Sequence, residues 1–575
     1  MKSSIITTDK AKCRDCYRCV RVCPVKSVCI SDGQARVDAE RCILCGTCVR
    51  ECPQQAKHVR NDLERVAAML ATPELTVASV APSFPAAFAD FGSGYLPPAL
   101  KKLGFDMVTE TAVGAELVAY STAGLIDNNK NCWVTSACPV IVNLIERYYP
   151  KACKNITPIV SPMVAHAKYL KQKFGKDIRV VFIGPCAAKK SEADEKGKGA
   201  VDAVLTFEEL HQALINAGID KKSLTPTPFD DVRPKNAQLF PLEGGLAKTA
   251  SIASGLLRED FVGLSGSEHV LEMIDHLSED SPIKLFEALF CPGGCINGPC
   301  LGQSKDIFAR RSRVLQYHKR KTYEAEEELD VISAQNVDLE MTISPTALQN
   351  AVFTEDQIRA VLTETGKHTT EDELNCGACG YSSCRENALA VLSGMAEHSM
   401  CIPWMRQLAE RKTDQIIDNS PNGIVMVDSA FNIVSFNPAF AKMFSCTESV
   451  IGRPIGTLMD PADFEQVAAE VVKRISGKMV SFPQYGLIAT ASIYRLEGEN
   501  VLIGIFANIT KTKEDEDRIS RMRSETLANA ERVIEQQMRM AQEIASILGE
   551  TTSETRVLLR KLTDLAREVD EQKEK

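Results

Sequence analysis

The sequence predicts a multidomain protein with α/β and α+β regions and a long helix at its C-terminus. Three observations support this: a duplicated cysteine run at the start, buried strands that alternate with helical patterns in the middle, and a heptad-like apolar spacing at the end. The 575 residues fit about three to five domains of ordinary size. We place the boundaries at 1–71, 72–305, 306–370, 371–411, 412–511 and 512–575.

Residues 1–71 contain an internal duplication. A run of four cysteines recurs 29 residues later, and proline follows each run: Cys13, Cys16, Cys19 and Cys23, then Cys42, Cys45, Cys48 and Cys52. This is the spacing of bacterial two-cluster ferredoxins, in which the fourth cysteine of each run binds the other cluster. It predicts a ferredoxin-like domain with one 4Fe-4S cluster on Cys13, Cys16, Cys19 and Cys52 and another on Cys42, Cys45, Cys48 and Cys23. A pair of zinc sites is the alternative.

Residues 72–305 have the pattern of an α/β fold. The segments 74–81, 178–183 and 201–206 read as buried strands, and helical patterns such as 140–149 follow them. This alternation favours a parallel sheet, with Cys138 and Cys186 just beyond strand ends. Pro139 suits the first position of a helix, so helix N–H groups are expected to face that region.

Three short motifs in this region each supply cysteine: TSACP at 135–139, GPCAAK at 184–189 and CPGGC at 291–295. Thiolates are the soft ligands that iron clusters select. The two glycines of the third motif allow the backbone to approach inorganic sulfide closely. In this order the three motifs resemble those of the FeFe hydrogenases.

The resemblance implies an H-cluster: a 4Fe-4S cube joined to a diiron unit that carries carbon monoxide, cyanide and a bridging dithiolate, where hydrogen is made from protons or split. It implies that the cube is held by Cys138, Cys186, Cys291 and Cys295, and that Cys295 also bridges to the diiron unit. Lys189 matches the family lysine that donates a hydrogen bond to a cyanide, which suits an ammonium beside an anionic cofactor.

Two positions depart from the family pattern. Strongly catalytic members have a proton-carrying cysteine where this chain has Ala137, and alanine has no exchangeable proton. Because a positioned acid or base is worth ~10² to 10⁴ in rate, turnover is expected to fall steeply. Gly184 replaces a methionine, which removes a bulky, polarizable wall beside the cofactor. Glu110 and Glu116 are candidates for the remaining acids of the proton relay and receive no assignment.

Residues 306–370 are polar and charged and are expected to form a connector. In 371–411, the spacing of Cys376, Cys379, Cys384 and Cys401 resembles a small single-cluster module found in several anaerobic redox proteins. The resemblance implies a third 4Fe-4S cluster outside the active site on these four cysteines. Zinc is the alternative here too.

Residues 412–511 resemble a PAS sensory domain. The resemblance rests on the segments 416–428 and 432–440, on 451–454, and on the strand-like run 500–508. Such domains hold a ligand in their cleft or pair with one another. The segment has no histidine that could serve as a haem ligand, so protein contact is the expected role.

Residues 512–575 read as one long helix with apolar positions at alternating steps of four and three. The stripe comprises Val533, Gln537, Met540, Ile544, Ile547 and Thr551, then Leu558, Leu562, Leu565 and Val569. The eleven-residue step after Ile547 marks a stutter in a coiled coil. Such a stripe needs a partner, and we predict homodimerisation; the alternative is an antiparallel hairpin that folds back on the core.

The composition indicates a cytoplasmic redox protein. A net charge of −9 and the lack of a lysine- or arginine-rich stripe argue against nucleic-acid binding. The polar N-terminus and the absence of an apolar run of about 18 residues argue against export and membrane insertion. The 21 cysteines are therefore expected to be metal ligands in a reducing compartment. A local basic patch would suit an acidic ferredoxin as electron partner.

These features together predict a sensory FeFe hydrogenase with low hydrogen turnover. The PAS-like segment and the terminal helix are not needed for turnover, so we expect them to report hydrogen or redox state to a separate partner such as a phosphatase or kinase. Maturation proteins would supply the diiron unit. Two alternatives stay open: a catalytic ferredoxin-linked hydrogenase, and an iron-sulfur scaffold that never receives the diiron unit.

Overall fold

The computed structural model describes residues 4–89, 91–92, 94–128, 131–250, 260–277, 281–302, 306–321, 337–349, 351–496 and 500–571. The chain divides into two compact units, Met1–Met405 and Arg406–Lys575. Within the described ranges, every helix is too short or too polar to cross a lipid bilayer.

The eight-cysteine region, residues 4–62, is built from two copies of one loop. Strand β1 (Ile6–Thr8) pairs antiparallel with β4 (Lys57–Val59), and β2 (Val28–Ser31) pairs with β3 (Gln34–Val37). The short helices α1 (Arg18–Arg21) and α2 (Thr47–Arg50) each start within a cysteine run.

The duplication extends to the backbone conformation. Positive φ angles occur at Asp15, Tyr17 and Lys26 and again, 29 residues later, at Leu44, Gly46 and Gln55. Residues in this conformation turn successive N–H groups toward one side of a loop, which makes a concave site for an anion. The repeated loop therefore favours two anionic centres of the same kind.

The α/β body, residues 63–321, contains two parallel sheets, as the strand and helix pattern predicted for a single sheet. The first has the order β6-β5-β8-β9, with β5 (Thr76–Val80), β6 (Met107–Glu110), β8 (Arg179–Gly184) and β9 (Ala203–Thr206). The second has the order β10-β11-β7, with β7 (Trp133–Val134), β10 (Phe261–Ser265) and β11 (Leu285–Leu289).

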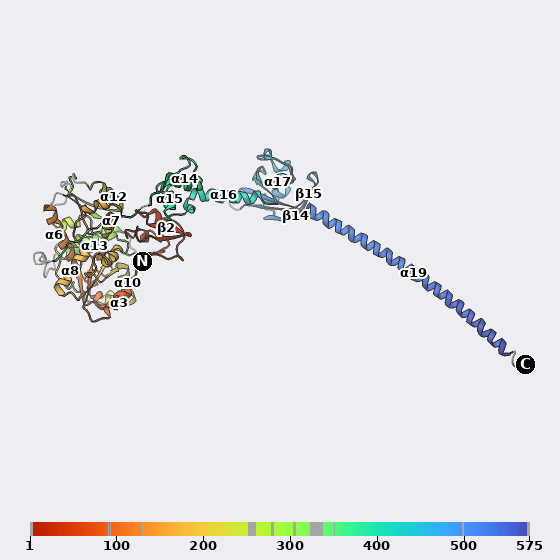
Figure 1. The fold of residues 1–575 in the computed structure, drawn as a ribbon, viewed down its shortest axis with the longest axis horizontal. Coiled ribbons are helices and arrows are strands. Elements are labelled where there is room, and N and C mark those ends of the chain that lie inside the picture. Colours follow the sequence, from red (N-terminus) through yellow and green to blue (C-terminus); the bar gives the residue numbers. More distant parts are fainter. Residues whose placement is uncertain are drawn as a thin grey trace. The chain divides into compact units, whose positions relative to one another are not determined.

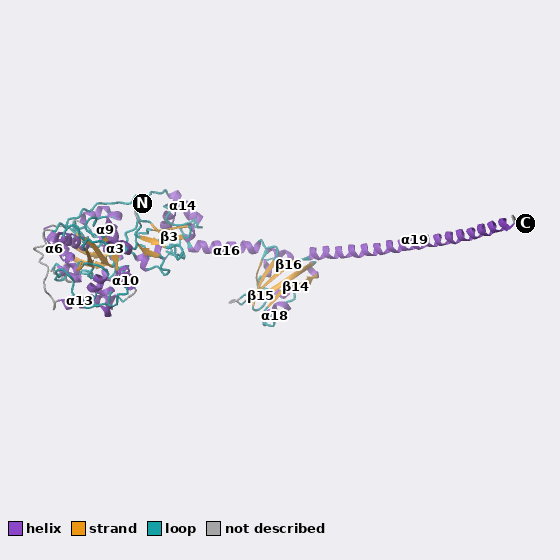
Figure 2. Ribbon diagram, turned by 90° about the horizontal axis from the view of Figure 1, so that it is seen from below, coloured by secondary structure: helices purple, strands orange, loops and turns teal. Residues whose placement is uncertain are grey.

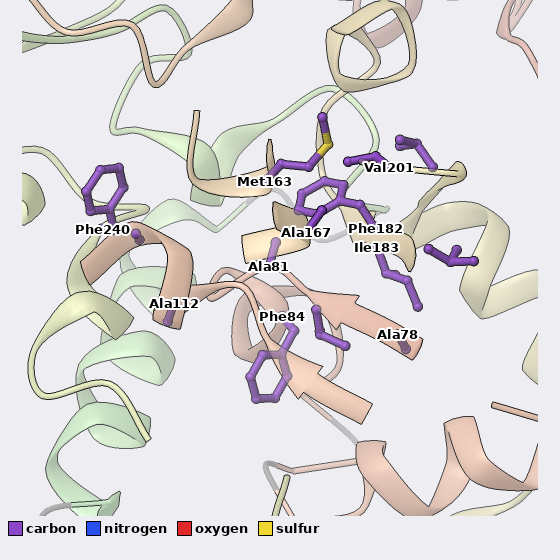
Figure 3. Packing of buried hydrophobic residues seen from close by; sticks show 14 of the residues in the cluster. Ala78, Ala81, Phe84, Ala112, Met163, Ala167, Phe182, Ile183, Val201 and Phe240 are labelled. Carbon is purple, nitrogen blue, oxygen red and sulfur yellow. The ribbon is translucent and has the colours of Figure 1, made fainter. Parts of the chain in front are cut away.

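Helices surround both sheets (Figure 1). They are α3 (Leu63–Leu70), α4 (Phe84–Ala87), α5 (Leu96–Lys102), α6 (Ala112–Asn128), α7 (Pro139–Tyr148), α8 (Pro162–Phe174), α9 (Ala188–Asp194), α10 (Phe207–Asn216), α11 (Gly245–Thr249), α12 (Ser267–Asp275) and α13 (Ile307–Lys321). Every residue of β5, β9 and β11 is buried, as expected for strands covered on both faces. Figure 3 shows Met163 of α8 and Phe182 of β8 packed near Ala81, which follows β5.

Two expected boundaries shift because apolar side chains decide them. Helix α3 was expected in the first domain, yet Val66 belongs to the core of the α/β body. The expected connector at 306–370 also packs on its neighbours in its described parts. Val314 and Tyr317 of α13 are buried in the body, and α14 (Glu355–Glu364) packs through Leu362 against α15 (Cys384–Leu392).

A buried ion network ties the eight-cysteine region to the α/β body. The Lys190 Nζ, fully buried, donates to Asp62 Oδ2 at 3.0 Å and to Glu209 Oε1 at 2.9 Å. Arg60 Nη1 donates to Asp194 Oδ2 at 2.6 Å. Breaking a buried pair of this kind leaves an uncompensated charge, so the network fixes α9 relative to the eight-cysteine region.

The four-cysteine module, residues 351–401, docks on the eight-cysteine region beside β2 (Figure 1). Ile30 N donates to Met395 O at 3.1 Å, and Arg21 Nη1 donates to Ala378 O at 3.1 Å. Gly380, at φ +98°, leaves no room for a side chain, because a Cβ there would lie 3.1 Å from the Arg21 backbone nitrogen.

The second unit contains an α+β domain. Its antiparallel sheet has the order β13-β12-β16-β15-β14 (Figure 2), with β12 (Gly423–Asp428), β13 (Ile433–Phe436), β14 (Arg474–Phe482), β15 (Leu487–Arg495) and β16 (Val501–Asn508). Helices α16 (Ile402–Asp418), α17 (Pro438–Met443) and α18 (Ala462–Ala468) accompany it. Phe440, Phe444 and Phe506 pack against one another in its interior.

Helix α19 (Thr510–Glu571) confirms the predicted terminal helix. Val533, Ile544 and Leu562 of the predicted stripe are exposed in this single chain. Thr551, Leu565 and Val569 lie outside the side chains that the structure describes.

Gly114 of α6 tests the close crossing of α6 and α8. A Cβ at Gly114 would lie 2.3 Å from Pro162 O and 2.5 Å from His166 N. Gly114→Ala is therefore expected to lower the thermal unfolding midpoint, with a cost of about 1–3 kcal/mol for overpacking. The matched control is Gly124→Ala on the same helix, where a Cβ meets no heavy atom of the described residues within 4 Å. Calorimetry should show the control unchanged or more stable by up to about 1 kcal/mol; equal effects of the two changes would contradict the crossing.

Candidate active site

A partly enclosed cavity of about 90 Å³ lies beyond the carboxyl ends of strands from both sheets. Ala81, Thr111 and Cys186 follow β5, β6 and β8, and Cys291 follows β11. Parallel sheets commonly bind ligands at this end of their strands. The residues predicted from sequence that line the cavity are Ala137, Cys138, Cys186, Lys189, Cys291 and Cys295.

Local backbone structure brings the cysteines into the cavity. Cys138 is the N-cap of α7 and Pro139 is its first residue, as the sequence predicted. Gly294 has φ +92°, and a Cβ there would lie 2.2 Å from Pro241 O. Because only glycine fits, the loop can turn so that Cys295 N donates to Pro241 O at 2.8 Å.

The cavity thiols are close enough to influence one another electrostatically. Burial, and then the charge of Cys138, raises the pKa of Cys186 to about 11. Burial, followed by Cys138 and Cys186, raises the pKa of Cys295 to about 12. The pKa of Cys291 lies well above its usual range, because of burial first and then Cys186, Cys295 and Cys138. Four thiolates can be held here only when a cationic centre offsets their mutual repulsion.

The donor set fits a multi-iron cluster better than a single ion. Among the described residues, no group of three or more histidine, cysteine or acidic side chains is spaced to hold one metal ion. The four cavity cysteines nevertheless come from three separate loops and face one cavity. Thiolates arranged around a shared space, without single-ion spacing, suit an iron-sulfur core and disfavour the zinc interpretation.

Lys189 brings a buried ammonium to the cavity. Its Nζ donates to Glu192 Oε2 at 2.7 Å and to Ala137 O at 3.4 Å. The side chains of Lys189 and Glu192 are only 10% and 5% exposed. Glu192, which the sequence gave no reason to select, therefore fixes the ammonium at the cavity wall.

Phe182 explains the space at Gly184. A Cβ at Gly184 would lie 2.6 Å from the Phe182 ring and 3.2 Å from the Ala81 Cβ. Phe182 also lines the cavity, whereas Gly184 does not. An aromatic ring two residues earlier on β8 thus occupies the space next to Gly184, a contact that the position of the glycine in the motif did not reveal.

The cysteines of the eight-cysteine region fall into two electrostatic groups. Burial, then Cys45, Cys42 and Cys23, raises the pKa of Cys48 well above its usual range. These four residues match one predicted ligand set, and Cys45 also lines the cavity. A second group contains Cys13, Cys16 and Cys19: burial raises the pKa of Cys19, Lys57 lowers it, and Cys13 and Cys16 raise it further.

Cys52, predicted as the fourth ligand of the second group, has the same local setting as Cys23. Its Sγ accepts from Ala56 N at 3.3 Å, and Cys23 Sγ accepts from Ser27 N at 3.3 Å. The donors, like the cysteines, are 29 residues apart, so the two fourth-ligand positions are built alike.

In the four-cysteine module, Cys379 is the electrostatic neighbour of Cys401 and Cys376: burial raises its pKa, Tyr381 N–H lowers it, and these two thiols raise it further. Cys384 is the first residue of α15, and its N–H donates to Asn375 Oδ1 at 2.8 Å. Tyr381 connects the module to the eight-cysteine region, because burial, and then Cys379 and Cys23, raises its pKa to about 12.

The two candidate relay acids lie near the cavity without lining it. Glu110 Oε1 accepts from Tyr317 Oη at 2.6 Å. Glu116 Oε2 accepts from Asn236 N and Ala237 N, and burial raises the pKa of Glu116 to about 7. A carboxyl with this pKa holds its proton in the folded state at pH values where an unfolded chain has lost it.

Glu116 should therefore give the α/β body a pH-dependent stability. Between pH 4.5 and 7 the folded state binds more protons than the unfolded state, so stability falls as the pH rises. Glu116→Gln removes this term. Its thermal midpoint relative to wild type is expected to improve between pH 5 and pH 8, by the equivalent of about 2 kcal/mol. Glu268→Gln, at an exposed position on α12, serves as control; the same pH trend in both variants would contradict the assignment.

Comparison with known families agrees with this arrangement. Residues 74–299 match the family described as iron only hydrogenase large subunit, C-terminal domain. Residues 35–58 match a 4Fe-4S binding domain, 372–403 a family described by its Fe-S cluster, and 411–476 a PAS domain.

The relatives are hydrogenases. Iron hydrogenase 1 of Clostridium pasteurianum is 28% identical over 371 residues, which are 52% of this chain and 65% of the relative. The periplasmic Fe hydrogenase large subunit of Nitratidesulfovibrio vulgaris is 25% identical over 259 residues, 36% of this chain and 62% of the relative. The chain thus spans less than two thirds of the length of both relatives.

Solved structures of low similarity include a FeFe hydrogenase of Chlamydomonas reinhardtii, at 19% identity and a TM-score of 0.38, covering 50% of this chain and 100% of that one. A PAS domain from Haloarcula marismortui has 20% identity and a TM-score of 0.16, covering 18% of this chain and 95% of that one. From the family matches and the hydrogenase relatives, we conclude that the chain belongs to the FeFe hydrogenase family and combines that family's domain with a 4Fe-4S binding motif and a PAS domain.

Proposed function

We propose that this chain is a sensory FeFe hydrogenase. It reads hydrogen or redox state at an H-cluster, turns hydrogen over slowly, and relays the state through iron-sulfur clusters and the PAS domain to a signalling partner. Hydrogen and protons are its substrates, and the cytoplasm is its compartment. The single observation that carries the proposal is Ala137 on the cavity wall, beside the buried ammonium of Lys189.

The cavity residues support this role through what they lack and what they hold. The methyl group of Ala137 cannot donate or accept a proton, so the wall offers no acid at this position. Lys189 Nζ, held by Glu192, is placed to donate to an anionic ligand in the cavity. A site that binds hydrogen chemistry but passes protons poorly suits detection better than bulk conversion.

The H-cluster would be held by Cys138, Cys186, Cys291 and Cys295, with Cys295 as the bridge to the diiron unit. When bound, that unit would supply the reversible joining of two protons and two electrons to hydrogen. Maturation proteins would deliver it. Three 4Fe-4S clusters outside the active site would use the ligand sets given by the sequence: Cys13, Cys16, Cys19 and Cys52; Cys42, Cys45, Cys48 and Cys23; Cys376, Cys379, Cys384 and Cys401.

A route for electrons supports the relay. Cys45 lines the cavity and belongs to the group of Cys42, Cys48 and Cys23. Cys23 and Cys379 both act on Tyr381, which links that group to the four-cysteine module. Cys401 directly precedes α16, the helix that runs toward the PAS domain. A phosphatase or kinase encoded separately would receive the signal, and a ferredoxin would exchange electrons.

A catalytic ferredoxin-linked hydrogenase is the second candidate, favoured by the complete set of cavity cysteines and Lys189. A non-enzymatic scaffold without the diiron unit is the third. Measurable hydrogen turnover by maturated protein would exclude the scaffold. Turnover equal to that of a strongly catalytic hydrogenase would exclude the sensor.

The Ala137→Cys variant tests the sensor directly. We expect it to raise hydrogen evolution from reduced viologen by ~10²-fold or more, because it places an exchangeable proton on the cavity wall. Ala137→Val is the matched control, since it adds bulk without a proton and should not raise the rate. Wild-type protein that already evolves hydrogen as fast as the Ala137→Cys variant would contradict the proposal.

A second prediction concerns the proposed homodimer through the PAS domain and α19. Ile544 and Ile547 are 58% and 60% exposed on the apolar stripe. The double change Ile544→Lys and Ile547→Lys is expected to shift the sedimentation coefficient from dimer toward monomer at micromolar concentration. Gln542→Lys, placed off the stripe on the same turn, should leave the dimer intact. A monomeric wild type would refute the dimer.

A further inference from the structure

Lys367 is a buried lysine that sequence reasoning did not select. Helix α14 ends at Glu364, and Gly366 follows with φ +73°. Lys367 N then donates to Leu362 O at 2.9 Å, and Gly366 N donates to Thr363 O at 2.9 Å. This is the pattern of a Schellman motif, which reverses the chain after a helix. The reversal carries Lys367 into the four-cysteine module, where it is 8% exposed.

The ammonium of Lys367 has three acceptors. Its Nζ donates to Thr365 Oγ1 at 2.9 Å, to Thr365 O at 3.1 Å and to Cys401 Sγ at 3.3 Å. None of the ion pairs found in the described ranges involves Lys367, so no carboxylate there is its counterion. A buried ammonium is costly without an anionic partner. The Cys401 thiolate is the anion that its hydrogen bonds offer.

The other predicted ligand sulfurs have weaker donors. Ser27 N donates to Cys23 Sγ, Leu44 N to Cys42 Sγ, and Ala56 N to Cys52 Sγ. Lys57 is also buried near the eight-cysteine groups, yet its Nζ donates to Thr8 Oγ1 and Ala35 O. In the hydrogen bonds of the described residues, Lys367 is thus the charged donor to a predicted ligand sulfur. Charge-assisted bonds are about twice as strong as neutral ones.

The position of this sulfur gives the bond a consequence. A positive donor stabilises a cluster more in its reduced form, which carries one more negative charge, and hydrogen bonds to sulfur are a recognised control of cluster potential. The module also stands at the far end of the route that begins at the cavity and passes Cys45, Cys23 and Tyr381.

We propose that Lys367 raises the reduction potential of the cluster on Cys376, Cys379, Cys384 and Cys401, so that electrons leaving the cavity collect there. The inference rests on the cluster assignment made in the proposed function. In the step, the neighbouring cluster on the Cys23 group loses one electron and the module cluster gains it. No bond breaks, and Lys367 keeps its proton. The cluster that precedes α16 thereby becomes the place where the redox state of the active site is stored.

The test is a redox titration of the full-length protein, loaded with iron and sulfide and monitored by electron paramagnetic resonance. Cys376→Ala identifies the module cluster as the signal that disappears. In wild type, that signal is expected at the most positive potential of the three accessory clusters. Lys367→Met should make its reduction about tenfold less favourable, a shift of about 59 mV to more negative potential for one electron. Lys367→Arg, which keeps the charge, should restore most of the wild-type value.

Lys26→Met is the matched control at the same interface. The Lys26 Nζ donates to Val20 O at 3.2 Å and to Arg21 O at 3.3 Å, and to no sulfur. Its removal should shift the signal less than Lys367→Met does. An equal shift would overturn the role of the sulfur hydrogen bond, and so would an unmoved signal in Lys367→Met.

Two further outcomes separate this inference from the cofactor assignment. If Cys376→Ala removes no signal, the cluster itself is refuted. If Lys367→Met fails to bind iron, Lys367→Gln provides the second neutral variant, with a shift in the same negative direction expected. Loss of the cluster from both neutral variants would overturn the inference, because Lys367 would then serve assembly and not potential.

Discussion

Thiols that face the cavity are buried, and burial is the largest cause of the raised pKa values of Cys186, Cys291 and Cys295. Thiolates can persist in such a place only beside a cationic core, and the surrounding protein must hold them there before the core arrives. The strand ends, the helix start at Pro139 and the left-handed Gly294 meet that requirement. Other features of the first unit follow from this need to gather sulfur in an apolar interior.

The cavity wall then decides what the gathered sulfur can do. Lys189 supplies a positive charge that is held in place by Glu192, while Ala137 supplies only a methyl group. Phe182 occupies the space beside Gly184, so the wall is apolar and closely packed at that position. Anion recognition is retained in such a site, whereas proton delivery at Ala137 is not. This combination separates binding from turnover, which is the property that a detector requires.

The sequence predicted the local part of this arrangement well. Strands β5, β8 and β9, the helix that starts at Pro139 and the duplicated cysteine loops were all accessible, because each depends on a short run of residues. The second sheet, the packing of α3 and α13 on the body and the contacts of Phe182, Lys190 and Lys367 were not accessible. Each of these depends on a tertiary contact between segments whose local patterns give no sign of it. Lys367 in particular reads as a polar residue in a polar stretch until the turn after α14 buries it.

Infrared spectroscopy of the maturated protein, under hydrogen and then under argon, tests most directly whether the four cavity sulfurs support a gas-responsive centre. Bands from bound carbon monoxide and cyanide, shifting reversibly between the two gases, are the result that this account predicts. Absence of those bands after maturation, or bands that do not respond to hydrogen, would contradict it.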